Sequence, residues 1–375
     1  MDTHSPISRG GRADILALTK AGFEELAAKT IPGAAASAGI VYSAVFKTGR
    51  LDPAALGLGA AKTSAWTSAF RASYLFPERV VEERSELGTT AKASLRLEDG
   101  LAIECVRIPM AVRGPDEGRA TLCVSSQVGC KMGCAFCETG RHGLIRNLSA
   151  GEIVAQVLTA RFSLGWRFRN IVFMGMGEPL DNAEEVFAAL EVLMDRSAFG
   201  FAQDRIALCT AGHVDGLRLL AHRPWGRLKL SVSLNAASDE LRSRIMPIDR
   251  RWPLAELAAA LRDYPKRRNF VLALNYCLIP GLNDSALDVE RLASFCQGLG
   301  RVLVNLIPYN PGSAPIGRAP SEEEIKVFTS RLIAAGLKTR RRATHGRERY
   351  AQELVRGLRR NVIPRSISAL GLRPS

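Results

Sequence analysis

The sequence predicts an α/β protein whose core is a parallel β-sheet curved into a partial or full barrel. From about residue 119, short apolar runs typical of strands alternate with amphipathic stretches typical of helices, and the pattern yields six strand-then-helix units. Polar or glycine-containing motifs follow these apolar runs. In parallel α/β folds the functional residues lie at the carboxyl ends of the strands, so these motifs are the expected site.

The six expected strands share an apolar run that ends in a small or polar residue. They are ATLCVSS (120–126), NIVFMGM (170–176), RIALCTA (205–211), LKLSVSL (228–234), FVLALNYCLI (270–279) and RVLVNLIPY (301–309). The stretches SAGEIVAQVLTARF (149–162) and SDELRSRI (238–245) are expected helices between them. The sequence therefore places a barrel over residues 119–345.

The sequence before the expected barrel has a different pattern, with short alanine-rich stretches typical of helices. LTKAGFEELAAKTIP (18–32) and AAASAGIVYSAVFKTG (34–49) predict short helices, so residues 1–95 are expected to form a small helical accessory domain. Apolar residues alternate on both sides of the turn EDG, which predicts a hairpin or linker over 96–118. Residues 346–375 form a basic tail with one expected helix.

Composition narrows the class of protein. The chain has 51 Lys and Arg against 37 Asp and Glu, a formal net charge of +14. Such a surplus favours polyanions, with nucleic acid as the leading candidate, although solvated basic faces are the plain alternative. No apolar run approaches the length of a membrane span, and the first residues lack a secretory core. We therefore expect a cytoplasmic protein with reduced cysteines.

Three of the 8 cysteines fall within the segment GCKMGCAFCETG, residues 129–140. Their spacing, C-x₃-C-x₂-C, brings Cys130, Cys134 and Cys137 into one loop, and the glycines around them argue against a helix. Three thiolates can hold three irons of a [4Fe–4S] cluster and leave the fourth iron open for S-adenosylmethionine. The alternative is a zinc site with His142 as fourth ligand, although no second pair of ligands lies nearby.

The same segment resembles a known family. C-x₃-C-x₂-C is the radical S-adenosylmethionine signature, and its frame ATLCVSSQVGCKMGCAFCETG is similar to that of the RlmN/Cfr-type RNA adenine methyltransferases. The similarity continues through FMGMGEPLDN, SLNAASDELRSRIMPI, IPGLNDS and NLIPYNPG. The resemblance implies a partial (β/α)₆ barrel and methylation of adenine at C2 or C8 in 23S ribosomal RNA, with some members acting on tRNA. The resemblance also implies a [4Fe–4S] cluster and S-adenosylmethionine as cofactors.

Roles follow from the resemblance position by position. Cys130, Cys134 and Cys137 match the cluster ligands, and Glu104 and Cys123 match residues with proton-transfer or thiol roles. The residues that match S-adenosylmethionine contacts are Gly177, Glu178, Cys209, Ser233, Leu234, Asn235 and Asn310. The family usually has serine where this chain has Cys209 and histidine where it has Asn235. The plain alternatives are turn residues at strand ends and a buried strand cysteine.

One element of the family pattern is missing. Family members carry a cysteine near the C-terminus that is methylated first and then delivers its methyl group to the base. Here no cysteine follows Cys296, which lies on the apolar stripe of Val289 and Leu292 and is expected in the core, and Glu353 falls near the carrier position. Glutamate cannot carry a methyl thioether. We therefore expect cluster binding and cofactor cleavage to survive without C2 methylation by the family's own route.

The leading interpretation is a radical S-adenosylmethionine enzyme that modifies RNA. One alternative keeps the barrel and the cofactors but acts on a small metabolite, and the other is an RNA-binding descendant that does not methylate. In the leading interpretation the basic surface contacts phosphates, and a flavodoxin or ferredoxin supplies electrons.

Overall fold

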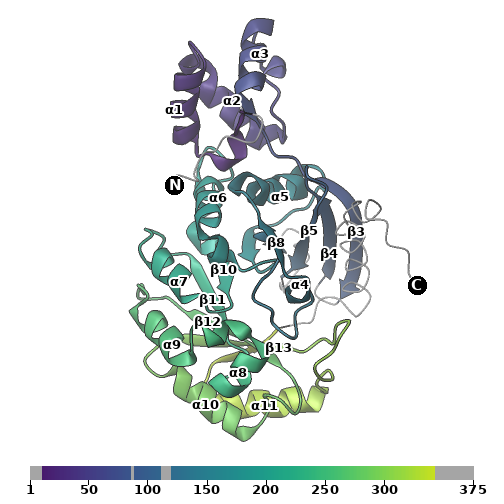
Figure 1. Ribbon diagram of the computed structural model, residues 1–375, viewed down its shortest axis with the longest axis vertical. Helices are drawn as coiled ribbons and strands as arrows, with labels where there is room; N and C mark the ends of the chain where they lie inside the picture. The colour runs from purple at the N-terminus through teal and green to yellow at the C-terminus, as the bar shows by residue number, and fades with distance from the viewer. Residues whose placement is uncertain (1–10, 86–87, 111–119, 343–375) are drawn as a thin grey trace, which may run out of the picture.

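The computed structural model describes residues 11–85, 88–110 and 120–342 (Figure 1). It consists of an N-terminal helical module, a large mixed sheet and helices packed around that sheet. Figure 1 shows the module at one end of the long axis, and α7, α9, α10 and α11 around the outside of the other end. The basic tail at 346–375 and Glu353 lie outside the described residues.

The N-terminal module confirms the expected helices and adds a third. It contains α1 (Lys20–Thr30), α2 (Ala35–Thr48) and α3 (Ala60–Ala69), with the short parallel pair β1 (Ala13–Asp14) and β2 (Phe70–Arg71). Thr19 starts α1 because its hydroxyl accepts from the Gly22 amide. A buried aromatic cluster of Phe23, Tyr42, Trp66 and Phe70 forms its core.

Ten strands form the main sheet, in the order β14-β13-β12-β11-β10-β9-β6-β5-β4-β3. The strands from β6 to β14 in this order are parallel to their neighbours. They are β6 (Ala120–Val124), β9 (Asn170–Phe173), β10 (Ile206–Thr210), β11 (Lys229–Ser233), β12 (Leu272–Leu278), β13 (Val302–Pro308) and β14 (Thr339–Arg341). All six predicted strands are therefore confirmed, and β14 extends the parallel part.

An antiparallel extension continues the sheet beyond β6. It consists of β5 (Ala102–Pro109), β4 (Gly88–Arg96) and β3 (Phe76–Ser85). The predicted hairpin around EDG is confirmed as β4 and β5. The prediction of a helical domain through residue 95 is wrong for 76–85 and 88–95, which lie in β3 and β4. β3 shows no apolar alternation because it is a mostly exposed, charged edge strand.

Helices follow the parallel strands and cover one face of the sheet. They are α5 (Ala150–Phe162), α6 (Ala183–Met194), α7 (Val214–Ala221), α8 (Asp239–Ile245), α9 (Leu254–Asp263), α10 (Ala286–Cys296) and α11 (Glu322–Ala334). Short 3₁₀ helices lie at Ile15–Ala17, Ala54–Leu56, Pro179–Asn182, Gln203–Arg205 and Pro247–Arg250. The expected helices over 149–162 and 238–245 are α5 and α8. Cys296 ends α10 half-buried against the core, as expected.

The two faces of the parallel strands differ in chemistry. Leu208, Val232, Leu274 and Leu306 are fully buried on the helix-covered side. The alternate positions, which we call the inner face, carry Cys209, Ser233, Asn275 and Asn305. An apolar sheet needs no such row of polar groups in its interior, so the inner face is where the fold positions chemistry.

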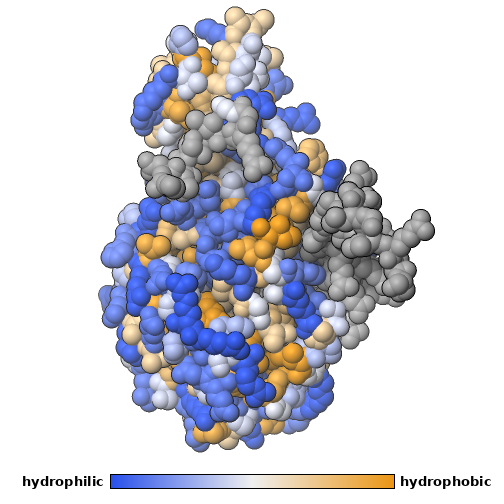
Figure 2. Space-filling view, viewed as in Figure 1, coloured by the Kyte–Doolittle hydropathy of each residue, from blue (hydrophilic) through white to orange (hydrophobic). Residues whose placement is uncertain are grey.

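In the described residues, no helix is both long and apolar enough to cross a bilayer. The face seen in Figure 2 is largely hydrophilic and is interrupted by apolar patches near its centre and right side.

Candidate active site

The three clustered cysteines lie in a loop between β7 (Gln127–Gly129) and α4 (Glu138–Arg141). β7 pairs antiparallel with β8 (Leu144–Asn147), so the two ends of the segment that carries the cysteines lie side by side. The Cys130 amide donates to the Gly143 carbonyl at 2.8 Å. Gly129 has a φ of +80°, and a Cβ there would collide with the same carbonyl oxygen.

A second anchor comes from α8. The Ala135 amide donates to the Ile245 carbonyl at 2.9 Å. Within the loop, the Cys137 amide donates to the Cys134 carbonyl at 3.0 Å. The expectation of a non-helical loop holds for the cysteines themselves. It fails for Gly140, which lies in the four-residue helix α4 directly after them.

Cys130 is buried, Cys134 and Cys137 are half-buried, and the thiols affect one another. Burial raises the pKa of Cys130 to about 12, and the nearby Cys137 adds to the rise. Burial also raises the pKa of Cys134, with further contributions from Cys137 and Cys130. Three thiolates together therefore require a compensating cation, which the irons of a cluster would provide.

The chemistry of the donor set agrees with that assignment. Cys130, Cys134 and Cys137 are free cysteines within one loop, and each could supply one thiolate to one iron. The residues present therefore fit a [4Fe–4S] cluster with one iron left open.

Gly177 and Glu178 lie in the turn after β9, which ends at Phe173. Gly177 has a φ of +100°, and a Cβ would lie 2.6 Å from the Cβ of Gln127, so only glycine fits here. The Glu178 side chain is buried, and its carboxylate accepts from the amides of Leu180 at 3.1 Å and Ala211 at 2.6 Å. It therefore ties the end of β9 to the end of β10, a structural contact in addition to the expected ligand contact.

Cys209 and Ser233 meet on the inner face. The Cys209 Sγ lies 3.6 Å from Ser233 Oγ and accepts from Asn275 Nδ2 at 3.2 Å. Burial raises the pKa of Cys209 to about 11, and the hydrogen bonds partly oppose the rise. A neutral thiol in this row can stand in for the serine hydroxyl of the related family as a hydrogen-bonding group.

Leu234 and Asn235 follow β11, and Asn235 is strained. Asn235 has a φ of +59°, the one positive φ at a non-glycine residue in the described part of the chain. Its side-chain oxygen accepts from the Cys277 amide at 2.9 Å, and its Nδ2 lies 3.2 Å from Met246 Sδ. The backbone is engaged as well: the amides of Leu234 and Asn235 donate to the Asn275 carbonyl, and the Asn235 carbonyl accepts from Asn283 Nδ2 at 2.7 Å. These contacts fix the turn after β11.

Asn310 lies two residues after β13, in a loop fastened to the cluster loop. The Glu138 carboxylate accepts from the Ser313 amide and hydroxyl, each at 2.7 Å. A Cβ on Gly312 would collide with the same carboxylate. Glu138 directly follows Cys137, so this contact couples the loop of Asn310 to the last of the three cysteines.

Glu104 and Cys123 are brought together at the junction of the antiparallel extension with the parallel sheet. Glu104 on β5 forms an ion pair with Lys92 on β4 at 2.6 Å, and Cys123 on β6 faces Val106 of β5. Burial raises the pKa of Cys123 to about 12; the charges of Cys209 and Glu104 add to the rise, and Lys92 opposes it. The thiol and the carboxylate thus lie within electrostatic reach of each other.

Sequence reasoning missed Arg242, which holds two strand ends. Its side chain is fully buried and pairs with Asp249 at 2.7 Å. It also donates to the carbonyls of Leu234 at 3.1 Å and Ala211 at 2.6 Å, after β11 and β10. Lys92 was missed as well. An arginine within SDELRSRI reads as an exposed helix residue, so the sequence carries no sign of its burial.

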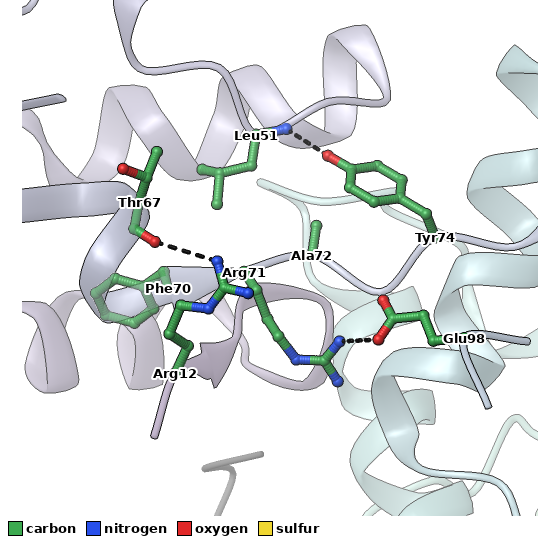
Figure 3. A pocket seen from close by; sticks show the side chains of 8 residues that line it. All are labelled: Arg12, Leu51, Thr67, Phe70, Arg71, Ala72, Tyr74 and Glu98. Carbon is green, nitrogen blue, oxygen red and sulfur yellow. Dashed lines mark hydrogen bonds and ion pairs between the residues drawn. The ribbon is translucent and has the colours of Figure 1, made fainter. Parts of the chain in front are cut away.

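A pocket of about 350 Å³ lies elsewhere, beside the N-terminal module (Figure 3). Arg71 in its wall bonds Glu98 at 2.7 Å, and Arg12 donates to the Thr67 carbonyl at 3.4 Å. The residues that Figure 3 labels include none of the candidate site residues, so this pocket is separate from the inner face.

The chain is similar to known proteins over most of its length. A model of the radical SAM superfamily matches residues 124–293. The probable dual-specificity RNA methyltransferase RlmN 1 of Protochlamydia amoebophila is 44% identical over 261 residues, covering 70% of this chain and 71% of that protein. The dual-specificity RNA methyltransferase RlmN of Syntrophotalea carbinolica is 45% identical over 278 residues, covering 74% and 71%.

A solved structure extends the similarity to three dimensions. The crystal structure of a radical SAM methyltransferase from Sphaerobacter thermophilus is 38% identical, with a TM-score of 0.78. The match covers 89% of this chain and 96% of that one.

Proposed function

Because the chain belongs to the RlmN family of radical S-adenosylmethionine RNA methyltransferases, we propose that it modifies an adenine of RNA, in ribosomal RNA or tRNA. Family membership brings with it a [4Fe–4S] cluster and S-adenosylmethionine. When bound, the cluster supplies the electron that breaks a carbon–sulfur bond of S-adenosylmethionine. The observation that carries the proposal is the inner face, where small and polar groups end successive strands beside a loop with three cysteines.

Cys130, Cys134 and Cys137 would hold the cluster. The S-adenosylmethionine contacts would come from the residues that gather at the carboxyl ends of β9, β10, β11 and β13. These are Gly177, Glu178, Cys209, Ser233, Leu234, Asn235 and Asn310. The positive φ of Gly177 supports this role, because a glycine without a Cβ lets the backbone come close to a ligand.

Glu104 would take up or release a proton at the substrate base, and Cys123 would supply a thiol beside it. Lys92 supports this assignment because its contact with Glu104 at 2.6 Å fixes the carboxylate at the edge of the inner face. Both residues come from strands that precede the cluster loop, so acid–base chemistry and cofactor binding belong to different parts of the sheet.

The C-terminal sequence bears on the final step of the proposed reaction. No cysteine follows Cys296 in the sequence, and Glu353 stands near the carrier position. We therefore propose that cofactor cleavage is retained and that C2 methylation through a C-terminal thioether is not. A different radical modification, or methyl transfer through another thiol, would use the inner-face cysteines.

Anaerobic reconstitution followed by incubation with methyl-labelled S-adenosylmethionine and RNA tests the proposal. We expect 5′-deoxyadenosine to form in an RNA-dependent manner, and no 2-methyladenosine at family-like rates. Formation of 2-methyladenosine would contradict the proposed loss of the carrier route. 5′-Deoxyadenosine without any dependence on RNA would favour a small metabolite, and RNA binding without cofactor cleavage would favour a non-methylating descendant. A Cys134→Ala variant serves as the control without a complete cluster.

A cytoplasmic location and a flavodoxin or ferredoxin as electron donor complete the proposal. Both would follow from a reduced cluster and an RNA substrate. Electron transfer from each donor to the reconstituted protein, followed by the loss of cluster absorbance, tests the second point.

A further inference from the structure

β14 presents arginines to both faces of the sheet at its edge. Arg341 points outward, where its guanidinium forms a bidentate ion pair with Glu322 of α11 at 2.5 and 2.7 Å. Arg340 is the register partner of Asn305, so it faces the inner side. Arg342, two residues later, faces the same side and continues the ladder through its amide, which donates to the Leu306 carbonyl at 2.8 Å.

Arg342 is joined to the polar row of the inner face. Its Nε donates to Asn305 Oδ1 at 3.2 Å. Asn305 Nδ2 donates to Asn275 Oδ1 at 3.0 Å, and Asn275 Nδ2 donates to Cys209 Sγ at 3.2 Å. The hydrogen bonds run in one direction, from the guanidinium to the thiol of the candidate cofactor site. The Nε bond fixes the orientation of the guanidinium and leaves its two terminal nitrogens for another acceptor.

The charge of this pair is not compensated within the described residues. There, neither Arg340 nor Arg342 forms an ion pair with a carboxylate, whereas Arg341 and Arg318 each pair with a glutamate of α11. Burial and the neighbouring charge of Arg340 lower the pKa of Arg342. Arg340 and Arg342 are both exposed, so an anion from solution can reach them. Two like charges on one face attract such an anion, and the planar guanidinium fork matches the oxygens of a phosphate.

We propose that Arg340 and Arg342 form a phosphate-binding site for the RNA substrate, at the β14 edge of the inner face. The inference rests on the proposed function and adds to it the place where the RNA backbone is held. A phosphodiester bound here would place its nucleotide toward the row that ends at Cys209.

Salt dependence of RNA binding tests the site. A fluorescein-labelled RNA hairpin is titrated anaerobically with the reconstituted full-length protein, between about 50 and 200 mM NaCl. The variants are Arg340→Ala, Arg342→Ala, the double variant and Arg342→Lys. Arg341→Ala is the matched control, because it removes the same charge from the same strand on the other face. Thermal melting and iron content verify folding, and Arg342→Lys keeps the test valid if Arg342→Ala misfolds.

The RNA association constant K falls with salt, so log K plotted against log salt has a negative slope. We expect the magnitude of this slope to decrease by about 0.7–0.9 for Arg340→Ala and for Arg342→Ala, and by about twice that for the double variant. Arg342→Lys and Arg341→Ala should retain the wild-type slope. Unchanged slopes in both alanine variants, or an equal fall in Arg341→Ala, would overturn the site. So would an unchanged slope with a weaker affinity for S-adenosylmethionine, which would assign the arginines to the cofactor carboxylate. Wild-type protein that binds no RNA would instead overturn the proposed function.

Discussion

Removing the partner of Arg242 should destabilise the protein more than any exposed ion pair can. Asp249→Ala leaves a guanidinium whose side chain is 0% exposed without its carboxylate. Breaking a buried pair in this way costs about 3–5 kcal/mol. The carbonyls of Leu234 and Ala211 still accept from Arg242, so we expect the lower end, about 3 kcal/mol.

The assay is equilibrium denaturation of the anaerobic holoprotein in urea, followed by circular dichroism. Arg218→Ala is the matched control. It removes a guanidinium that is 57% exposed and forms ion pairs with Asp215 and Glu256, each at 3.3 Å. Exposed pairs contribute about 0.2–1 kcal/mol, so the free energy of unfolding should change by less than about 1 kcal/mol.

The site gives this prediction a second readout. Arg242 holds the backbone after β10 and after β11 together, so Asp249→Ala should also weaken S-adenosylmethionine binding, whereas Arg218→Ala should not. If Asp249→Ala unfolds at the same urea concentration as Arg218→Ala, with the same slope, the buried pair does not stabilise the strand ends as argued.

Four further outcomes are expected. Cys134→Ser should lower bound iron and sulfide and abolish 5′-deoxyadenosine formation; full iron content in this variant would contradict the ligand assignment. Glu104→Gln should lower RNA modification by about 10²–10⁴-fold, the range for a general acid or base, with cofactor binding unchanged. Glu138→Ala should raise the S-adenosylmethionine concentration for half-saturation several-fold, because it releases the loop of Asn310. Calorimetry measures the affinity of the Glu104→Gln and Glu138→Ala variants for S-adenosylmethionine. The ion pair with Arg318 lowers the pKa of Glu324 to about 2. The contribution of this pair to folding stability is therefore present above about pH 4.5 and is lost as the pH falls toward 2. Glu324→Gln should differ from wild type in melting temperature at pH 7, and the two melting temperatures should converge in acid.

The sequence predicted the parallel strands because each is an apolar run that a turn residue ends. Cys209, Ser233 and Gly177 could be placed at strand ends by the same reasoning, since the carboxyl ends of parallel strands meet at one edge. The resemblance to a family then supplied roles that strand position alone does not.

Contacts between distant segments could not be predicted in this way. Lys92 and Glu104 meet because β4 and β5 pair in a particular register, and the alternation of apolar residues does not identify their ion pair. The helical pattern of SDELRSRI indicates a solvent-exposed side chain for Arg242, whereas the structure buries it completely. Glu178 was expected to contact the cofactor, and only the structure reveals that its carboxylate also joins β9 to β10.

The sheet ends at two free edges, β3 and β14, in the described residues, instead of joining into a closed cylinder. A closed cylinder would admit only a molecule that enters through its mouth, so a polymer would have to present an end or a sharply protruding loop. A sheet with two open edges does not impose such an entry, and a long strand would be able to approach it sideways. Positions in the middle of a chain are then as accessible as its termini, and a covalently circular RNA should be accepted as readily as its linear counterpart.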